Sequence, residues 1–214
     1  MSDIFRPKIH RKGAYALLFL LAAAAFCAGC LGAKPYVPTS DDEALFKAKG
    51  VDKTLYEAIR KGENDYFVIV AVFKHDVFLM QSAALEQSSI PVLSELGKAA
   101  LLLVRANEVL PMLRDPSMTK AVWFGSQGSL ARLDPSLELD MLGRFGKGDE
   151  SKPVAILARF YSVPGAAEEK AITAAGFEIS TKSGPTLIIS GPVSGIPKLL
   201  ERDQIAYLEK GNFP

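Results

Sequence analysis

One histidine, His75, is the strongest candidate for acid–base or metal chemistry outside the first thirty residues. It stands between Lys74 and Asp76, directly after an apolar run. A catalytic histidine needs a nucleophile to activate and a carboxylate to orient its ring. Nothing in the surrounding sequence supplies that set of residues. We therefore expect His75 to lie in a solvated loop, and we predict no catalytic residue.

Two groups of polar residues resemble known functional motifs, a serine hydrolase turn and a calcium-binding loop, but their residue spacing differs from that of the motifs. Gly125-Ser126-Gln127-Gly128-Ser129 looks like the sharp turn of a serine hydrolase, but it lacks the Gly-x-Ser-x-Gly order. Asp134, Glu138 and Asp140 could suggest calcium, but leucines interrupt the alternation of oxygen ligands that a calcium loop needs. The sequence therefore predicts no metal site and no cofactor.

Composition narrows the classes of protein to which the chain can belong. It has 214 residues, 49% of them hydrophobic, and a formal net charge of +1. So hydrophobic a chain with so little net charge is not intrinsically disordered. Nucleic-acid binding requires an excess of basic residues on one face. We therefore predict a folded protein that does not bind nucleic acid.

The first thirty residues have the layout of an export signal. A basic head that contains Arg6 and Lys12 precedes an uncharged, apolar run that begins at Gly13. The run ends in Cys27-Ala28-Gly29-Cys30, small residues directly before a cysteine. This pattern resembles the lipobox of bacterial lipoproteins, although Cys27 stands where leucine is preferred. The resemblance implies that residues 1–29 are a signal peptide and that Cys30 is the lipidation site.

Another interpretation of the same run is an uncleaved membrane anchor. Gly13–Ala33 has about the ~20 residues that span a bilayer. Both interpretations place the rest of the chain in the cell envelope, outside the cytoplasm. By resemblance to enteric lipoproteins, Leu31 after the cysteine favours the periplasmic side of the outer membrane over the inner membrane. The only cysteines are Cys27 and Cys30, so we predict no disulfide in the exported part.

The remaining chain contains two similar halves. At an offset of 87 residues, the apolar run 66–73 lies over 153–160, and Gly97 lies over Gly184. The periodicity of apolar residues and the positions of turns agree across both halves. We therefore expect a lipidated tether and short helix over 30–51, one module over 52–125, a linker over 126–133 and a second module over 134–214.

Each half is predicted to have the order βαββαβ, which is the ferredoxin-like α+β sandwich: a four-stranded antiparallel sheet with helices on one face. We expect Asp134 and Pro135 to begin a helix, and Gly176 to end another in the left-handed conformation. Ser40, Asn107 and Ser194 are expected to cap helices. The first helix of each module is expected over Leu79–Ser88 and Ala166–Ala175.

The second module also resembles the propeptide-inhibitor modules of subtilisin-like proteases. The similarity rests on apolar and turn patterns in Asp134–Leu137, Val154–Phe160, Ala174–Phe177, Ile196–Leu200 and Ile205–Glu209. In that family the sheet packs on the protease and the following tail lies in the active-site cleft. The resemblance implies that 210–214 would be this tail, although no protease domain follows it here.

The sequence favours a non-enzymatic, membrane-anchored lipoprotein that binds another envelope protein, with inhibition of a subtilisin-like protease as the second hypothesis. Its partners would be membrane lipid through Cys30 and an envelope protein of unspecified identity, with a protease as one class. Trp123, Phe124 and Phe213 are the candidate partner-binding residues, although aromatic side chains on such strands usually belong to the core. An enzyme that uses His75 and a scaffold-forming lipoprotein are weaker hypotheses.

Overall fold

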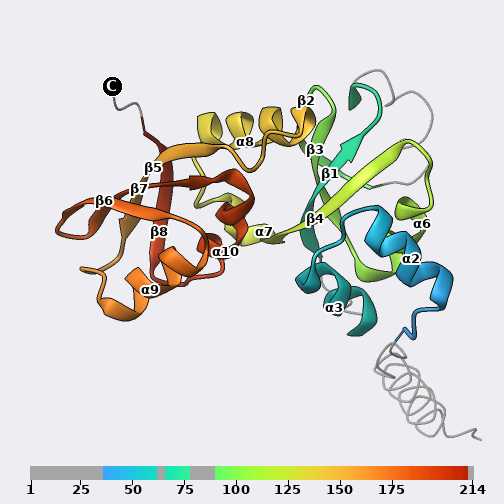
Figure 1. Cartoon of the computed structure of the whole chain (residues 1–214), viewed down its shortest axis with the longest axis horizontal. Coiled ribbons are helices and arrows are strands. Elements are labelled where there is room, and N and C mark those ends of the chain that lie inside the picture. Colours follow the sequence, from blue (N-terminus) through green and yellow to red (C-terminus); the bar gives the residue numbers. More distant parts are fainter. Residues whose placement is uncertain (1–35, 62–65, 78–89, 212–214) are drawn as a thin grey trace, which may run out of the picture. The chain divides into compact units, whose positions relative to one another are not determined.

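The computed structural model describes residues 36–61, 66–77 and 90–211. All of these residues belong to one compact unit. In the described part, helices accompany two four-stranded antiparallel sheets, so the protein is of the mixed α+β class. Figure 1 shows one sheet in green tones and the other in orange and red.

The first sheet has the strand order β2-β3-β1-β4, with antiparallel neighbours throughout. Helix α6 (Ala106–Leu113) connects β3 to β4, and helices α2 (Ser40–Ala48) and α3 (Lys53–Lys61) precede the sheet. Its strands are β1 (Phe67–Phe73), β2 (Val92–Leu96), β3 (Ala99–Val104) and β4 (Met118–Ser126).

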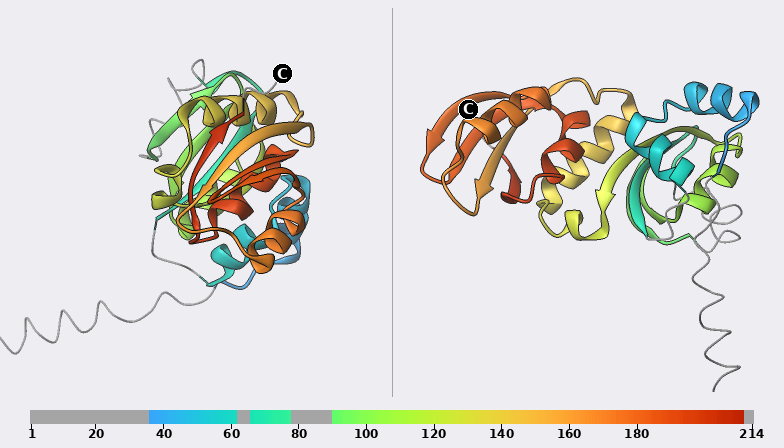
Figure 2. Two further views of the ribbon diagram at one scale, coloured as in Figure 1. Left: turned by 90° about the vertical axis from the view of Figure 1, so that its left-hand side faces the viewer. Right: turned by 90° about the horizontal axis from the view of Figure 1, so that it is seen from below.

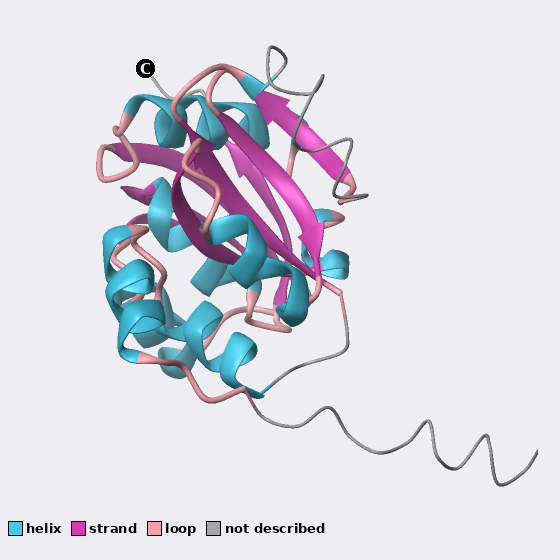
Figure 3. Ribbon diagram, turned by 90° about the vertical axis from the view of Figure 1, so that its right-hand side faces the viewer, coloured by secondary structure: helices cyan, strands magenta, loops and turns pink. Residues whose placement is uncertain are grey.

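The second sheet has the order β6-β7-β5-β8, again with antiparallel neighbours. Helix α8 (Pro135–Lys147) precedes it, and α9 (Ala166–Ala174) connects β5 to β6. A 3-10 turn and α10 (Ile196–Leu200) connect β7 to β8. Its strands are β5 (Pro153–Phe160), β6 (Glu178–Ser183), β7 (Thr186–Pro192) and β8 (Ile205–Lys210). Figure 3 shows the strands in magenta with helices packed beside them.

The two sheets repeat each other in detail at the 87-residue offset. The hairpin turns hold Gly97 at φ +58° and Gly184 at φ +56°, a region that glycine enters without steric cost. Cross-strand partners and irregularities recur as well. The recurring features are the pairs Ile69–Leu102 and Ile156–Ile189, the irregularities Val92/Ser94 and Ile179/Thr181, and those at Val72/Phe73 and Arg159/Phe160.

Several predicted helix boundaries are confirmed. Asp134 is the N-cap of α8 and accepts hydrogen bonds from the N–H groups of Ser136 and Leu137, and Pro135 is the first residue of the helix. Gly176 follows α9 with φ +93°, as predicted for a left-handed C-terminal residue, and the aromatic ring after it is buried. Local sequence therefore determines these ends of the helices.

Other predicted caps are wrong by one or two residues. Thr39, not Ser40, caps α2: its side chain accepts from the N–H of Asp42, and the side chain of Asp42 accepts from the N–H of Thr39. Helix α6 begins after Arg105, and Asn107 lies inside it. Gly195, not Ser194, precedes α10. In the predicted linker 126–133, residue 126 ends β4 and a short helix, α7 (Gln127–Leu130), follows. The helix predicted over 79–88 lies outside the described residues.

Two hydrophobic clusters hold the unit together. One lies between the first sheet and helices α2, α3 and α6. The other begins on the opposite face of the first sheet, includes α8, and continues to the second sheet with α9 and α10. Helix α8 contacts β1, β2 and β3 as well as β8. Figure 2 shows α8, in yellow, from two further directions.

Candidate protein-binding surface

One face of the second sheet is turned away from its helices and is only half-buried. Along β5, Val154, Ile156 and Ala158 are buried toward the helices, whereas Leu157 is partly accessible and Arg159 is exposed. Strand β7 alternates in the same way. We call the accessible side the open face. Its central residues are Ala155, Leu157, Arg159, Thr186, Ile188, Ser190, Tyr207 and Glu209.

The corresponding face of the first sheet is closed. In the first sheet the row Val122–Val70–Leu101 runs across three strands, and its last two members are completely buried. The row at the 87-residue offset is Glu209–Leu157–Ile188, and all three of these residues remain partly accessible. The next rows are Lys120–Val72–Ala99 in the first sheet and Tyr207–Arg159–Thr186 in the second.

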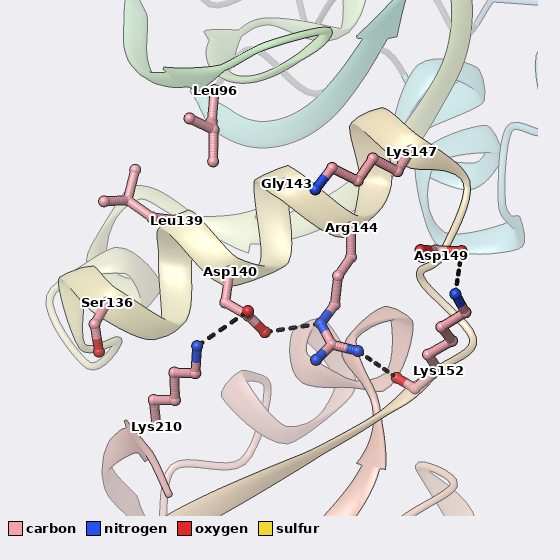
Figure 4. Close-up of a pocket in the computed structure, with 10 residues that line it drawn as sticks. All are labelled: Leu96, Ser136, Leu139, Asp140, Gly143, Arg144, Lys147, Asp149, Lys152 and Lys210. Atoms are coloured by element: carbon pink, nitrogen blue, oxygen red, sulfur yellow. Dashed lines mark hydrogen bonds and ion pairs between the residues drawn. The ribbon is translucent and has the colours of Figure 1, made fainter. Parts of the chain in front are cut away.

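Helices α8 and α10 make this difference. Helix α8 lies against β1, β2 and β3, and α10 contacts β4. Two glycines allow α8 to come close: a Cβ atom on Gly146 would lie 3.4 Å from the backbone nitrogen of Lys98, and one on Gly143 would lie 3.3 Å from Leu96 Cδ2. Figure 4 shows Leu96 of the neighbouring hairpin above α8. The first sheet is therefore covered by elements of the second half.

The covering elements also neutralise a cation on the closed face. Lys120 forms an ion pair with Glu150, which lies between α8 and β5. Its ammonium group also lies 5.6 Å from the centre of the Phe145 ring. Desolvation is the largest single influence and raises the pKa of Glu150, but the hydrogen bond from Lys120, a backbone hydrogen bond and the charge of Lys120 together hold the pKa of this carboxyl below its usual value. The closed face thus holds one strand cation against one carboxylate of its cover.

On the open face the corresponding row also has one cation, Arg159. Its Nη2 donates to Glu209 Oε2 over 2.8 Å, and the two side chains are 56% and 39% exposed. An ion pair this exposed contributes less than about 1 kcal/mol to folding. Only one of the five guanidinium N–H groups has a partner among the described residues. The remaining donors are available to an acceptor from outside.

Tyr207 belongs to the same row and is hydrogen-bonded to Asp134 at the start of α8. Its hydroxyl donates to Asp134 Oδ2 over 3.4 Å. Burial, followed by the charge of Asp134, raises the pKa of Tyr207. The hydroxyl of Ser136 is the largest contributor to the lowered pKa of Asp134. Tyr207 is therefore a neutral donor at neutral pH, which leaves Arg159 and Glu209 as the charges at the centre of the open face.

A second surface feature is a shallow pocket of about 570 Å³ beside α8 (Figure 4). Its carboxylates are already occupied: Asp140 accepts from both Arg144 and Lys210, and Asp149 pairs with Lys152. Although desolvation raises the pKa of Asp140, hydrogen bonds from Lys210 and Arg144 hold it below the usual value. These contacts join α8 to β8 and to the start of β5, so the pocket residues serve mainly to hold the fold.

The predicted aromatic residues do not gather on one surface. Phe124 is fully buried in the core. Trp123 is half-buried, packs 4.7 Å from the Phe67 ring, and borders a groove of about 400 Å³ near α3 and α10. Its Nε1 is buried without a hydrogen-bond partner in the described part of the chain. Phe213 lies outside the described residues.

The loop that contains His75 lies on the surface. His75 is exposed after β1, in the loop position that the sequence predicts. No group of three or more His, Cys, Asp or Glu side chains that could hold a metal ion occurs among residues 36–61, 66–77 and 90–211.

Cys30 and the run Gly13–Ala33 lie outside the described residues. Over the ranges that the structure describes, none of the helices has the length and apolar character needed to cross a bilayer. The first described residues are fixed firmly to the first half. Asp42 accepts hydrogen bonds from Tyr36, Thr39 and Arg114, and its carboxylate is almost completely buried. The hydrogen bond from Tyr36 contributes most to holding the pKa of Asp42 far below its usual value.

Sequence reasoning did not identify the open face. The signal was nevertheless present at the 87-residue offset, because Arg159 replaces Val72 and Glu209 replaces Val122. A strand buried on both faces is apolar throughout, whereas a strand with one wet face alternates. A position-by-position comparison of the two halves would have indicated that this face is covered in the first sheet and accessible in the second.

Comparison of the chain with protein-family models, with curated proteins and with solved structures finds no match.

Proposed function

We propose that the two halves are tandem ferredoxin-like modules that arose by internal duplication. The strand orders 2-3-1-4 and 6-7-5-8, with antiparallel neighbours, are those of a split βαβ sandwich. Helices α9 and α10 occupy the two crossovers of the second module, and α6 occupies the second crossover of the first. The shared register, strand irregularities and glycine turns at one constant offset support a duplication.

The chain is a non-enzymatic envelope lipoprotein, anchored through Cys30, that binds another protein. The anchoring part of this proposal rests on the sequence, in which small residues precede Cys30 at the end of an apolar run. Several acyl chains on one residue give stable attachment, whereas one chain is marginal. The periplasmic side of the outer membrane is the favoured location.

The open face is the observation that carries the binding part. A central row of Leu157 and Ile188 is half-buried, although the same row of the first sheet is buried beneath α8. Glu209, at the end of this row, forms an ion pair with Arg159 of the neighbouring row, and both charged side chains are accessible. An apolar centre bordered by polar groups is the usual composition of a reversible protein interface. We therefore assign partner binding to the second module.

Two experiments test this proposal separately. Metabolic labelling with an alkyne fatty acid should modify the wild-type chain and not Cys30→Ala, and label that persists in Cys30→Ala would reject lipid attachment at this residue. For binding, intact protein is purified from solubilised envelopes and the associated proteins are identified. Leu157→Lys should lose the specific partner, whereas Lys170→Ala, on the exposed side of α9, should retain it. Equal recovery with both variants would reject the open face.

Inhibition of a subtilisin-like protease is the second candidate, and one feature of the structure favours it. The backbone N–H of Gly211 donates to the carbonyl of Ala155 over 2.8 Å, so the chain leaves β8 beside the central strand of the open face. An enzyme docked on this face would meet the tail that follows. Residues 31–214 should then inhibit such a protease, and deletion of 211–214 should abolish the inhibition. Absence of inhibition across a panel of subtilisin-like enzymes would discard this candidate.

A further inference from the structure

The covered sheet shows what kind of segment fits the open face. Both sheets have the same strand order and corresponding cross-strand rows, and the irregularity at Val72/Phe73 recurs at Arg159/Phe160. The first sheet is covered by an amphipathic helix, α8, whose Leu142 and Phe145 belong to the same buried cluster as Val70 and Leu101. Helix α8 on the first sheet therefore shows that an amphipathic helix can pack on a sheet face of this geometry.

Four apolar positions of the closed face are polar on the open face. Val72, Ala99, Leu103 and Val122 of the closed face correspond to Arg159, Thr186, Ser190 and Glu209 on the open face. These polar groups make permanent burial less favourable, because a desolvated charge needs a partner. A segment that binds the open face can thus be released into water, unlike α8. This agrees with an exchangeable partner rather than a further fixed layer.

The charge pattern specifies one feature of that partner. On the closed face, strand cation Lys120 pairs with Glu150 of the covering segment. On the open face, Arg159 is the cation of the corresponding row, and it is more exposed than its neighbour Glu209. Its unused N–H donors match a carboxylate, which guanidinium groups bind in a planar, two-bonded geometry.

From this internal example we propose that the open face binds an amphipathic helix of a partner protein, with an apolar stripe over Leu157 and Ile188 and a carboxylate over Arg159. This inference rests on the proposed function, and it names the class of segment that the binding surface recognises. Helical recognition of this kind uses side chains spaced at i, i+3, i+4 and i+7. A second copy of the chain and an extended peptide are the competing occupants.

Site-specific photo-crosslinking in the intact, membrane-bound chain tests the proposal. The photoreactive amino acid p-benzoylphenylalanine is placed singly at position 157, at position 188, or at position 170 on the opposite side of the same module. The crosslinked segment is then mapped residue by residue by mass spectrometry. Thermal unfolding of each purified variant, followed by circular dichroism, confirms that the substitution leaves the module folded.

We expect crosslinks from 157 and 188, and not from 170, to one partner segment at sites three or four residues apart. Arg159→Glu should reduce the yield about tenfold, the size of effect expected for reversing a charge in a steered interface. Sites two residues apart would indicate a strand, which overturns the helix and leaves the proposed function standing. Crosslinks only to a second copy of the chain overturn the partner class. Yields at 157 and 188 no higher than at 170 overturn both proposals.

Discussion

The two central strands β1 and β5 occupy the same place in their sheets and yet have opposite burial. Every residue of β1 is buried, whereas β5 alternates between buried and accessible residues. The same backbone geometry therefore serves as an interior layer in one half and as a surface in the other. Helix α8 covers one face of the first sheet, whereas the corresponding face of the second sheet is accessible, and four apolar positions of the covered face are polar on the accessible one.

The largest contrast is expected from a charge at the centre of each face. Val70→Lys places an ammonium group in a completely buried row, and we expect it to lower the free energy of unfolding by more than about 4 kcal/mol. Leu157→Lys, at the corresponding position, can extend its chain into water and should cost about 1 kcal/mol or less. Urea unfolding of both variants in residues 31–214 measures this contrast. Equal losses would contradict the different burial of the two faces.

A second contrast concerns the side chains that fill corresponding positions in the hydrophobic cores of the two halves. In the second half, a Cβ on Gly191 would lie 2.5 Å from Phe177, whereas the first half has Val104 and Ile90 at these positions. Gly191→Val should therefore destabilise the protein by about 1–3 kcal/mol through overpacking. Adding Phe177→Ile gives the second half the same two residues as the first half, and it should restore part of the lost free energy of unfolding. A double variant less stable than the single one would show that the two cores are not equivalent.

The strand cations should differ in the same direction. Removing Lys120 leaves the mostly buried carboxylate of Glu150 without its partner, and we expect Lys120→Ala to cost about 1–2 kcal/mol. Removing Arg159 breaks an exposed pair, so Arg159→Ala should cost less than about 1 kcal/mol. Thermal unfolding at 0.05 M and 0.5 M salt distinguishes them, because added salt should reduce only the effect at Arg159.

A further effect is expected at low pH, from the carboxylate of Asp42 in α2, which is held by Tyr36, Thr39 and Arg114. The pKa of Asp42 is lower in the folded protein than in the unfolded chain, so its contribution to stability is present above the unfolded value near pH ~4. It is lost as the pH falls toward the folded pKa. The stability difference between wild type and Asp42→Asn should shrink as the pH falls below about 4. A constant difference down to pH ~2 would contradict this assignment.

The sequence was most informative where a local interaction determines the structure. Asp134 with Pro135 begins α8. Gly176 has the predicted left-handed conformation, and Gly97 and Gly184, whose turn positions agree across the two halves, also have positive φ. Each of these features depends on neighbours within a few residues. The apolar runs at 66–73 and 153–160 likewise predicted the two central strands, β1 and β5.

Prediction failed where distant residues decide. Thr39 and Ser40 both offer a capping hydroxyl, and the choice depends on Asp42, which is held by Arg114 from the end of α6. The covering of the first sheet by α8 could not be predicted from local patterns either. The two glycines that allow the close approach are poor helix formers, so in the sequence they only weaken the prediction of a helix. The open face follows from that covering, so it was missed for the same reason.

Cysteine accessibility tests the central contrast most directly, because residues 31–214 contain no cysteine of their own. Val70→Cys and Leu157→Cys place single thiols at corresponding positions of the two sheets. Under native conditions, a maleimide reagent should modify the thiol at 157 readily and should modify the thiol at 70 only at the rate of unfolding. Equal native-state rates at the two positions would contradict the account of one closed and one open face.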